Sequence, residues 1–186
     1  MNNLQCDLAR YDNSWYEPGG GKLKRLLWYF VNAMLLKSHL NPVNGLKVWL
    51  LRRFGAKIGQ GVVVKPGVSV KYPWMLDIGD YTWIGEDVWI DNLAKVSIGS
   101  NCCISQGAML LCGNHNFKKT TFDLIVKPII IEDGAWIGAK TTVCPGVTVK
   151  SHSVLCVGSV ANNDLQPFGV YKGIFAERIS TRNISN

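Results

Sequence analysis

The residue best suited to acid–base chemistry is His115. It is one of three histidines, with His39 and His152, and it lies in the turn-rich sequence Gly113-Asn114-His115-Asn116. That sequence opens the longest interruption of the repeat described below, and binding and reacting groups concentrate in loops on a rigid scaffold. An imidazole titrates near neutral pH, so His115 is naturally poised to act as a general base. A solvated loop histidine is the alternative, and we assign no role to His39 or His152.

Cysteines and histidines do not combine into a metal site in this sequence. The six cysteines include no C-x₂-C pair, so we expect no metal and, in a cytoplasmic protein, free thiols. We also expect no signal peptide, because the N-terminus lacks a basic region followed by an apolar run. The most apolar run, Leu26 to Leu36, is too short to span a bilayer as a helix.

Aliphatic residues recur every six positions from Ile58 onward. A six-residue period fits neither a helix nor an alternating strand. It predicts a prism in which each hexad forms one short strand and one corner, with the aliphatic side chain inside. Stacked coils then bury a core that no single repeat could bury. The fold class is therefore all-β, a parallel β-helix, with the inward positions Ile58, Val64, Val70, Ile78, Ile84, Ile90, Ile98, Ile104, Leu110, Ile131, Ile137, Val143, Val149, Leu155 and Ala161.

Three interruptions divide this repeat. If three hexads close one coil, the interruptions fall after residues 75, 95 and 115, along a single edge of the prism. The last interruption, Asn116 to Ile130, is the only sizeable loop. We divide the chain into an N-terminal helical cap (1–57), the hexapeptide-repeat β-helix (58–166) with a candidate active-site loop (113–130), and a C-terminal tail (167–186).

The segment before the prism is basic and has helical periodicity. Residues 1–57 carry nine Lys or Arg against three acids, whereas residues 58–186 carry eleven against ten. Asn41 and Pro42 predict the N-cap and first position of a second helix that runs to about Phe54, with Leu46, Trp49 and Leu50 on one face. The helices would cap the open end of the prism, and their basic and aromatic residues would also suit an anionic lipid surface. The first helix, over 22–37, is predicted by apolar residues at Leu23, Leu26, Leu27, Phe30, Val31, Met34 and Leu35.

Several segments resemble the left-handed parallel β-helix acetyltransferases. They are residues 113–117 (Gly-Asn-His-Asn-Phe) and residues 127–138, which end in Trp136-Ile137-Gly138. The resemblance is to the maltose/galactoside O-acetyltransferase group, and Leu51 to Gly59 and Tyr72-Pro73-Trp74 resemble its colanic-acid biosynthesis type. It covers roughly residues 45–180. It implies a homotrimer that binds acetyl-CoA between neighbouring prisms and O-acetylates a sugar in exopolysaccharide or surface-glycan biosynthesis.

The resemblance also implies roles for single residues. His115 would take the proton of a sugar hydroxyl as it attacks acetyl-CoA directly, without an acyl-enzyme. The backbone N–H of Ala139 would stabilise the tetrahedral intermediate, and Trp136 would wall the pantetheine channel. A carboxylate or a carbonyl would orient the imidazole, and Asp123 and Glu132 are only candidates for a carboxylate. Other residues implied to contact the co-substrate are Gly138, Val157, Gly158 and Ser159. The Thr-Lys pair that contacts the CoA phosphates in the family is replaced here by Asn162-Asn163, and Lys172 is the nearest basic substitute.

The acceptor pocket departs from the galactoside enzymes. Positions that contact the sugar there fall on Trp83 and Gly85 here. We expect instead an aromatic wall that stacks on a sugar ring, with polar groups at its rim. The residues expected to bind the sugar or glycan acceptor are Trp83, Trp89, Asp91, Asn92 and Asn114.

Other functions remain open at this stage. N-acetylation of an amino-sugar nucleotide or another small acceptor would use the same fold and acetyl-CoA. A non-catalytic glycan-binding β-helix would require neither His115 nor CoA. A γ-type carbonic anhydrase needs three imidazoles on zinc, and only one histidine is suitably placed. We expect no nucleic-acid partner, and a cytoplasmic location that the basic helices would extend to the inner face of the membrane.

Overall fold

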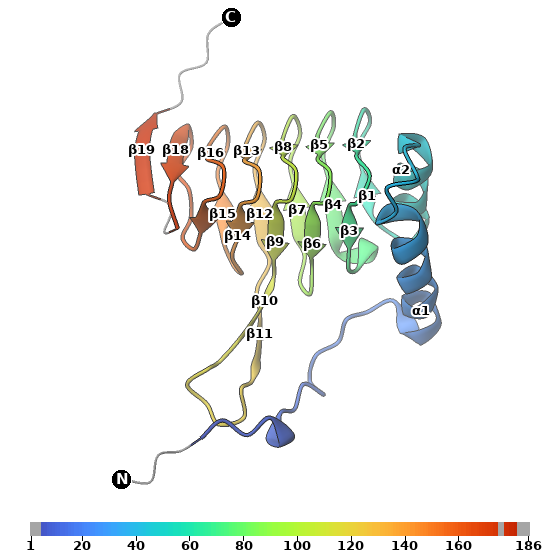
Figure 1. Cartoon of the computed structure of the whole chain (residues 1–186), viewed down its shortest axis with the longest axis vertical. Coiled ribbons are helices and arrows are strands. Elements are labelled where there is room, and N and C mark those ends of the chain that lie inside the picture. The colour runs from blue at the N-terminus through green and yellow to red at the C-terminus, as the bar shows by residue number, and fades with distance from the viewer. Residues whose placement is uncertain (1–4, 175–176, 182–186) are drawn as a thin grey trace, which may run out of the picture.

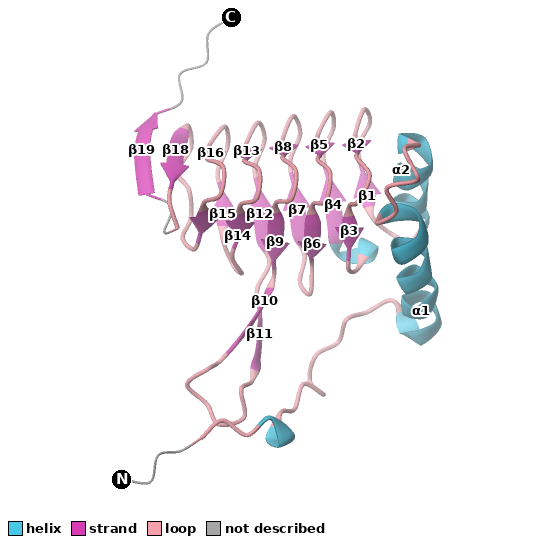
Figure 2. Ribbon diagram, viewed as in Figure 1, coloured by secondary structure: helices cyan, strands magenta, loops and turns pink. Residues whose placement is uncertain are grey.

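The chain winds into a three-sided prism of parallel strands with helices at one end (Figures 1 and 2). The computed structural model describes residues 5–174 and 177–181. The first sheet contains β1 (Lys57–Ile58), β4 (Leu76–Ile78), β7 (Val96–Ile98), β12 (Ile129–Ile131) and β15 (Thr148–Val149). The second contains β2 (Val63–Val64), β5 (Trp83–Ile84), β8 (Cys103–Ile104), β13 (Trp136–Ile137), β16 (Val154–Leu155), β18 (Gly169–Lys172) and β19 (Glu177–Thr181). The third contains β3 (Ser69–Val70), β6 (Trp89–Asp91), β9 (Met109–Leu111), β14 (Thr142–Val143) and β17 (Val160–Ala161).

The register between strands confirms the predicted hexads. Ile78 pairs with Ile58 in the coil before it and with Ile98 in the coil after it. All fifteen predicted inward positions are buried, none more than 9% exposed. Stacking of identical positions therefore produces one continuous aliphatic column inside each sheet, which is how a chain of two-residue strands obtains a core.

The insertions leave the prism at one edge, between the third sheet and the first, as predicted. A short 3₁₀ helix (Pro73–Met75) joins β3 to β4, and a bend at residues 92–95 joins β6 to β7. The long insertion is an antiparallel hairpin of β10 (Gly113–His115) and β11 (Leu124–Val126). Figure 1 shows this hairpin projecting away from the prism.

The N-terminal helices have somewhat different bounds from those predicted. α1 (Gly21–Val31) continues as a π-helical segment (Asn32–Leu36), so the first helix agrees with prediction. The predicted N-cap of the second helix is wrong, since α2 (Asn44–Arg53) begins three residues after Asn41. Asn41 instead accepts a hydrogen bond from the Val43 amide and donates one to the Leu35 carbonyl, and these bonds stabilise the turn between the helices.

Most of the predicted apolar stripe of the first helix is exposed, and only Val31 and Leu35 of that stripe pack against the core. Trp28 and Leu36 are buried, and the Trp28 indole N–H donates to the Val70 carbonyl at 2.8 Å. The predicted single face of α2 is also wrong, because Leu50 is buried while Leu46 and Trp49 are exposed. The exposed stripe consists of Leu23, Leu26, Leu27, Phe30 and Met34, each at least 51% accessible.

The far end of the prism is closed by β18 and β19, which extend the second sheet. Residues 175–176 and 182–186 of the predicted tail lie outside the described residues. Among the helices of the described segments, none is long and apolar enough to cross a membrane.

Candidate active site

The hairpin holds His115 in a defined orientation. His115 ends β10 and lies opposite Leu124 of β11. Its Nδ1 is 2.9 Å from the backbone carbonyl oxygen of Phe122. A carbonyl can only accept, so the neutral imidazole carries its proton on Nδ1 and leaves the Nε2 lone pair free. This is the tautomer that a general base requires.

Phe122 makes a second contact with the same imidazole. Its ring is stacked on that of His115, with centroids 4.4 Å apart and planes 7° apart. Phe122 also has a φ of 51°, in the left-handed region that costs a residue with a side chain about 1 kcal/mol or more. The backbone is held in this conformation at the residue whose carbonyl orients the histidine.

Of the carboxylate and the carbonyl left open by the sequence, the structure has a carbonyl, because the two candidate carboxylates have other partners. Asp123 lies 2.7 Å from the Lys119 ammonium, whose hydrogen bond lowers the pKa of Asp123. Glu132 accepts a hydrogen bond from the Ser151 amide at 2.8 Å. A backbone carbonyl takes the place of a carboxylate, and no residue type in the sequence could have indicated it.

An N-terminal segment that the sequence analysis missed lies against the hairpin (Figure 1). The Asp7 amide donates to the Thr120 carbonyl at 2.8 Å, and the Tyr11 ring centroid is 5.6 Å from that of His115. The segment is also bound to the prism, where the Trp74 indole N–H donates to the Pro18 carbonyl at 2.7 Å. The aromatic run at Tyr11, Trp15 and Tyr16 was the available sequence signal.

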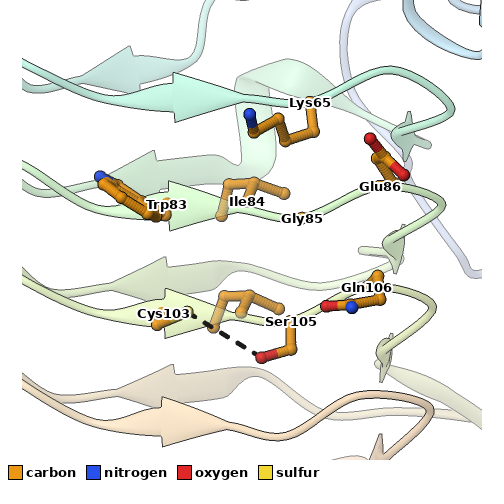
Figure 3. A pocket seen from close by; sticks show the side chains of 9 residues that line it. Lys65, Trp83, Ile84, Gly85, Glu86, Cys103, Ser105 and Gln106 are labelled. Carbon is orange, nitrogen blue, oxygen red and sulfur yellow. Dashed lines mark hydrogen bonds between the residues drawn. The ribbon is translucent and has the colours of Figure 1, made fainter.

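Two predicted tryptophans lie on the outer surface of the second sheet. Trp83 is 59% exposed and Trp136 is 48% exposed, with Cys103 of β8 between them in register. The Trp136 indole N–H donates to the Ser105 hydroxyl at 2.9 Å, which fixes its ring. Figure 3 shows Trp83, Cys103 and Ser105 along a cavity of about 270 Å³ on this sheet.

The predicted co-substrate residues line the edge between the second and third sheets. Gly138 is required by packing, since a Cβ there would lie 2.6 Å from the Leu155 carbonyl oxygen. Val157 and Gly158 are exposed at the next rung, while Ser159 is buried and accepts a hydrogen bond from the Gly173 amide. Within the described part of the chain, the Ala139 amide donates no hydrogen bond.

One chain does not bring the predicted catalytic groups together. His115 lies at the edge where the third sheet turns into the first, whereas Ala139 lies where the second sheet turns into the third. The whole width of the third sheet separates these two edges. A site that uses both groups therefore needs a second chain.

The residues predicted to form the acceptor wall do not share a single surface in one chain. Trp83 belongs to the second sheet, whereas Trp89 and Asp91 belong to the third. Asn92 is fully buried and bonds both backbone groups of Tyr72, at 2.9 and 2.7 Å, so it is structural. Asp91 is buried and lies 2.9 Å from the Lys71 ammonium.

Two predicted contacts lie at the periphery. Asn114 is exposed and its side chain accepts a hydrogen bond from the His115 amide at 2.8 Å. Lys172 is exposed at the end of β18. Over residues 5–174 and 177–181, no cluster of three or more His, Cys, Asp or Glu side chains could hold a metal ion.

Comparison with known proteins finds acetyltransferases, the class of enzyme that the sequence predicts. No family model matches the chain. WcaF of Escherichia coli (strain K12), assigned to colanic acid biosynthesis as an acetyltransferase, is 35% identical over 167 residues, which are 88% of this chain and 92% of WcaF. The galactoside O-acetyltransferase of that organism is 28% identical over 67% of this chain and 63% of its own.

Solved structures share the fold. A galactoside acetyltransferase in complex with coenzyme A has a TM-score of 0.76 and 26% identity, over 87% of this chain and 82% of its own. A hexapeptide-repeat acetyltransferase of Vibrio cholerae complexed with acetyl-coenzyme A has a TM-score of 0.80 and 23% identity, over 88% and 89%. The predicted left-handed parallel β-helix is thereby confirmed.

A prism of stacked hexad coils is the fold that this chain shares with the hexapeptide-repeat acetyltransferases. The chain belongs to the hexapeptide-repeat acetyltransferase family, in the group that contains WcaF. The predicted family and enzyme class are confirmed, and the CoA and acetyl-CoA held by the solved relatives agree with the predicted co-substrate.

Proposed function

We propose that this acetyltransferase moves the acetyl group of acetyl-CoA to a sugar hydroxyl, with His115 as the general base. The observation that carries the proposal is the hydrogen bond between His115 Nδ1 and the Phe122 carbonyl, which leaves Nε2 free to accept a proton. At neutral pH a sugar hydroxyl is too weak an acid to lose its proton and attack a thioester unaided. The reaction therefore needs a general base, and an imidazole with a free Nε2 lone pair can act as one.

The reaction proceeds by direct attack. Nε2 of His115 takes the hydroxyl proton as the acceptor oxygen bonds to the thioester carbon. The resulting oxyanion accepts a hydrogen bond from the Ala139 amide, which has no partner of its own among the described residues. The carbon–sulfur bond then breaks, and the imidazolium returns its proton to the CoA thiolate. The products are the acetyl ester and free CoA.

The complete site lies between two chains of a homotrimer. One chain contributes His115 from its hairpin. Its neighbour contributes Ala139 from the opposite edge of the third sheet and Trp136 from the adjoining second sheet. A closed three-fold ring presents these two edges to each other at every interface. Exposed Trp136, already fixed by Ser105, then forms one wall of the pantetheine channel.

The acceptor is a surface-glycan precursor, by analogy with the colanic acid assignment of WcaF. N-acetylation of an amino-sugar nucleotide is the second candidate, because an amine could replace the hydroxyl at the same base. Mass spectrometry of acetylated products from nucleotide-linked and lipid-linked sugars tests the choice. An O-acetyl ester, cleaved by mild alkali, supports the proposal, whereas an alkali-stable amide overturns it.

The helical end contacts an anionic lipid surface from the cytoplasmic side. No Asp or Glu occurs between Pro18 and Lys57, so this end is uniformly basic. Lys24 lies over the Trp74 ring and Arg52 donates to the Ile58 carbonyl, which leaves other cations for lipid. The exposed cations that would meet lipid headgroups are Lys22, Lys37 and Arg53, beside the apolar stripe and Trp49.

The basic charge of the helical end favours contact with a membrane over contact with a second copy of the chain. A homotypic contact would bring the same basic residues against each other, and like charges in contact repel. Anionic headgroups neutralise Lys22, Lys37 and Arg53, while the acyl boundary accepts the apolar stripe. The proposal extends the predicted cytoplasmic location to the membrane face.

A further inference from the structure

A groove lies beside the hairpin, between the N-terminal segment, α1 and the third sheet. It consists of two adjoining cavities of about 560 Å³ and about 320 Å³, which share the lining residues Arg25, Lys71 and Tyr72. The larger cavity lies between the N-terminal segment and the edge at which the insertions leave the prism. The smaller one continues along the third sheet to Trp89. This groove is separate from the cavity on the second sheet.

One end of the groove is lined by neighbours of the candidate base His115. Tyr11 and Leu124 line the larger cavity. The Tyr11 ring is 5.6 Å from the His115 ring, and Leu124 is the hairpin partner of His115. An acceptor in the groove would therefore have one sugar unit beside His115 and the remainder extending toward Trp89.

The groove walls are aromatic and already ordered. The Tyr16 hydroxyl donates to the Leu93 carbonyl at 2.6 Å, and Tyr72 is stacked on Trp74 at 5.2 Å. Trp89 is 45% exposed at the far end. Flat aromatic surfaces held in place are suited to the apolar faces of sugar rings, and they lose little conformational entropy when a ligand binds.

Arg25 carries the unbalanced charge of the groove. The lining contains two cations, Arg25 and Lys71, and one anion, Asp91. Lys71 is paired with Asp91 at 2.9 Å. Arg25 is half-buried in α1, and its side chain makes no ion pair or hydrogen bond within residues 5–174 and 177–181. A guanidinium has five donors in a planar fork, a geometry that matches a carboxylate or phosphate.

We propose that this groove binds an acceptor saccharide that carries an oxyanion, and that the Arg25 guanidinium pairs with that oxyanion. The inference rests on the proposed function, since the acetylated hydroxyl must lie at His115. Arg25 thereby determines specificity for acidic over neutral acceptors, while the aromatic walls bind sugar rings of either kind. The oxyanion is a uronate carboxylate or a sugar phosphate, two sources of the same chemistry.

The test uses three acceptors that differ only at C6: methyl β-D-glucoside, its 6-phosphate, and methyl β-D-glucuronide. Binding is measured by ligand-observed NMR and turnover by CoA release. We expect the protein to prefer at least one of the two anions, and Arg25→Gln to weaken binding of that anion by about 10- to 100-fold, with less than threefold effect on the glucoside. The favoured anion identifies the source.

Controls separate a specific charge from a folding defect. Arg25→Lys keeps the charge and should recover part of the affinity. Lys57→Gln removes an exposed charge outside both cavities and should change nothing. Equal losses for all three acceptors, or no preference for an anion in the unaltered protein, would overturn the inference. Anion binding through Arg25 without CoA release would instead count against the proposed function alone.

Discussion

The backbone carbonyl of Phe122 accepts a hydrogen bond from His115 Nδ1 at 2.9 Å, while the ring of Phe122 lies parallel to the imidazole at 4.4 Å. The first contact fixes the tautomer and the second fixes the tilt of the ring. The same residue therefore sets both properties on which proton transfer depends, and it does so from a left-handed backbone conformation.

Altering Phe122 should slow catalysis without weakening acetyl-CoA binding. Phe122→Leu removes the stacked ring but keeps the carbonyl, and should lower kcat by about tenfold, because small displacements of a reacting group are costly. Phe122→Gly also frees the backbone and should lower it further. Steady-state kinetics check this, with Phe117→Leu as a control on the same hairpin, where Phe117 is 78% exposed. A change in the KM for acetyl-CoA at constant kcat would contradict the positioning role.

Removing the imidazole of His115 should remove the general base and lower kcat. His115→Ala should lower kcat by roughly 10²–10⁴, the usual scale for loss of general-base catalysis, with an unchanged Kd for acetyl-CoA. The matched control is His39→Ala, since the His39 imidazole contacts Asp87 away from the hairpin. Retention of more than half of the activity by His115→Ala would remove this residue from the mechanism.

A site shared between chains should show complementation. His115→Ala and Trp136→Ala chains, each nearly inactive alone, are unfolded together and reassembled. Random mixing in a three-fold ring leaves both groups intact at about a quarter of the interfaces, so about a quarter of the normal activity should return. A mixture no more active than its two components would show that each site lies within one chain.

Membrane contact should depend on both charge and the apolar stripe. Replacing Lys22, Lys37 and Arg53 by Gln should weaken co-sedimentation with anionic vesicles by roughly 100-fold, at about 1 kcal/mol per charge. Leu26→Ser with Phe30→Ser should weaken it as well. Binding to the unaltered protein should also fall as salt rises. Trp83→Ser is the control, because Trp83 is exposed on the prism flank; equal binding by all variants would leave only an end-capping role for the helices.

Lys47 should destabilise the fold at neutral pH. Its side chain is fully buried, its ammonium donates to the Asn41 carbonyl at 3.2 Å, and burial lowers its pKa below 10.5. The unfolded chain therefore binds more protons, so stability should rise with pH from the lowered pKa up to about 10.5. Lys47→Met should raise the free energy of unfolding by about 1–2 kcal/mol at pH 7 and remove that rise.

Urea denaturation across this pH range provides the measurement. Lys57→Met is the matched control, since Lys57 is an exposed lysine on β1. A less stable Lys47→Met protein would show that the hydrogen bond to Asn41 outweighs the cost of burying the charge.

The sequence predicted the prism because each rung depends on one local rule. An aliphatic residue every sixth position must point inward, and pairing of Ile58, Ile78 and Ile98 in register follows without any long-range information. The edge of the insertions followed from counting hexads. His115 was located by its residue type and by the loop that contains it.

Other features depend on contacts that a one-dimensional pattern does not contain. The partner of His115 is a backbone carbonyl, which every residue possesses, so attention fell on Asp123 and Glu132. The helical period of the first helix identified an apolar face but not what covers it. The docking of Tyr11 against His115 joins segments about a hundred residues apart, and only the folded chain brings them together.

The number of coils sets the distance between the helical end and the hairpin. Each coil before the hairpin contributes twenty residues, as the register of Lys57, Asp77 and Ser97 shows, and advances the prism by one strand spacing of about 4.8 Å. The hairpin leaves the prism after the third coil, so its point of departure lies roughly 14 Å along the prism axis from β1, the strand next to α2. Adding or deleting a whole coil would change the distance between the hairpin and the helical end in steps of one rung.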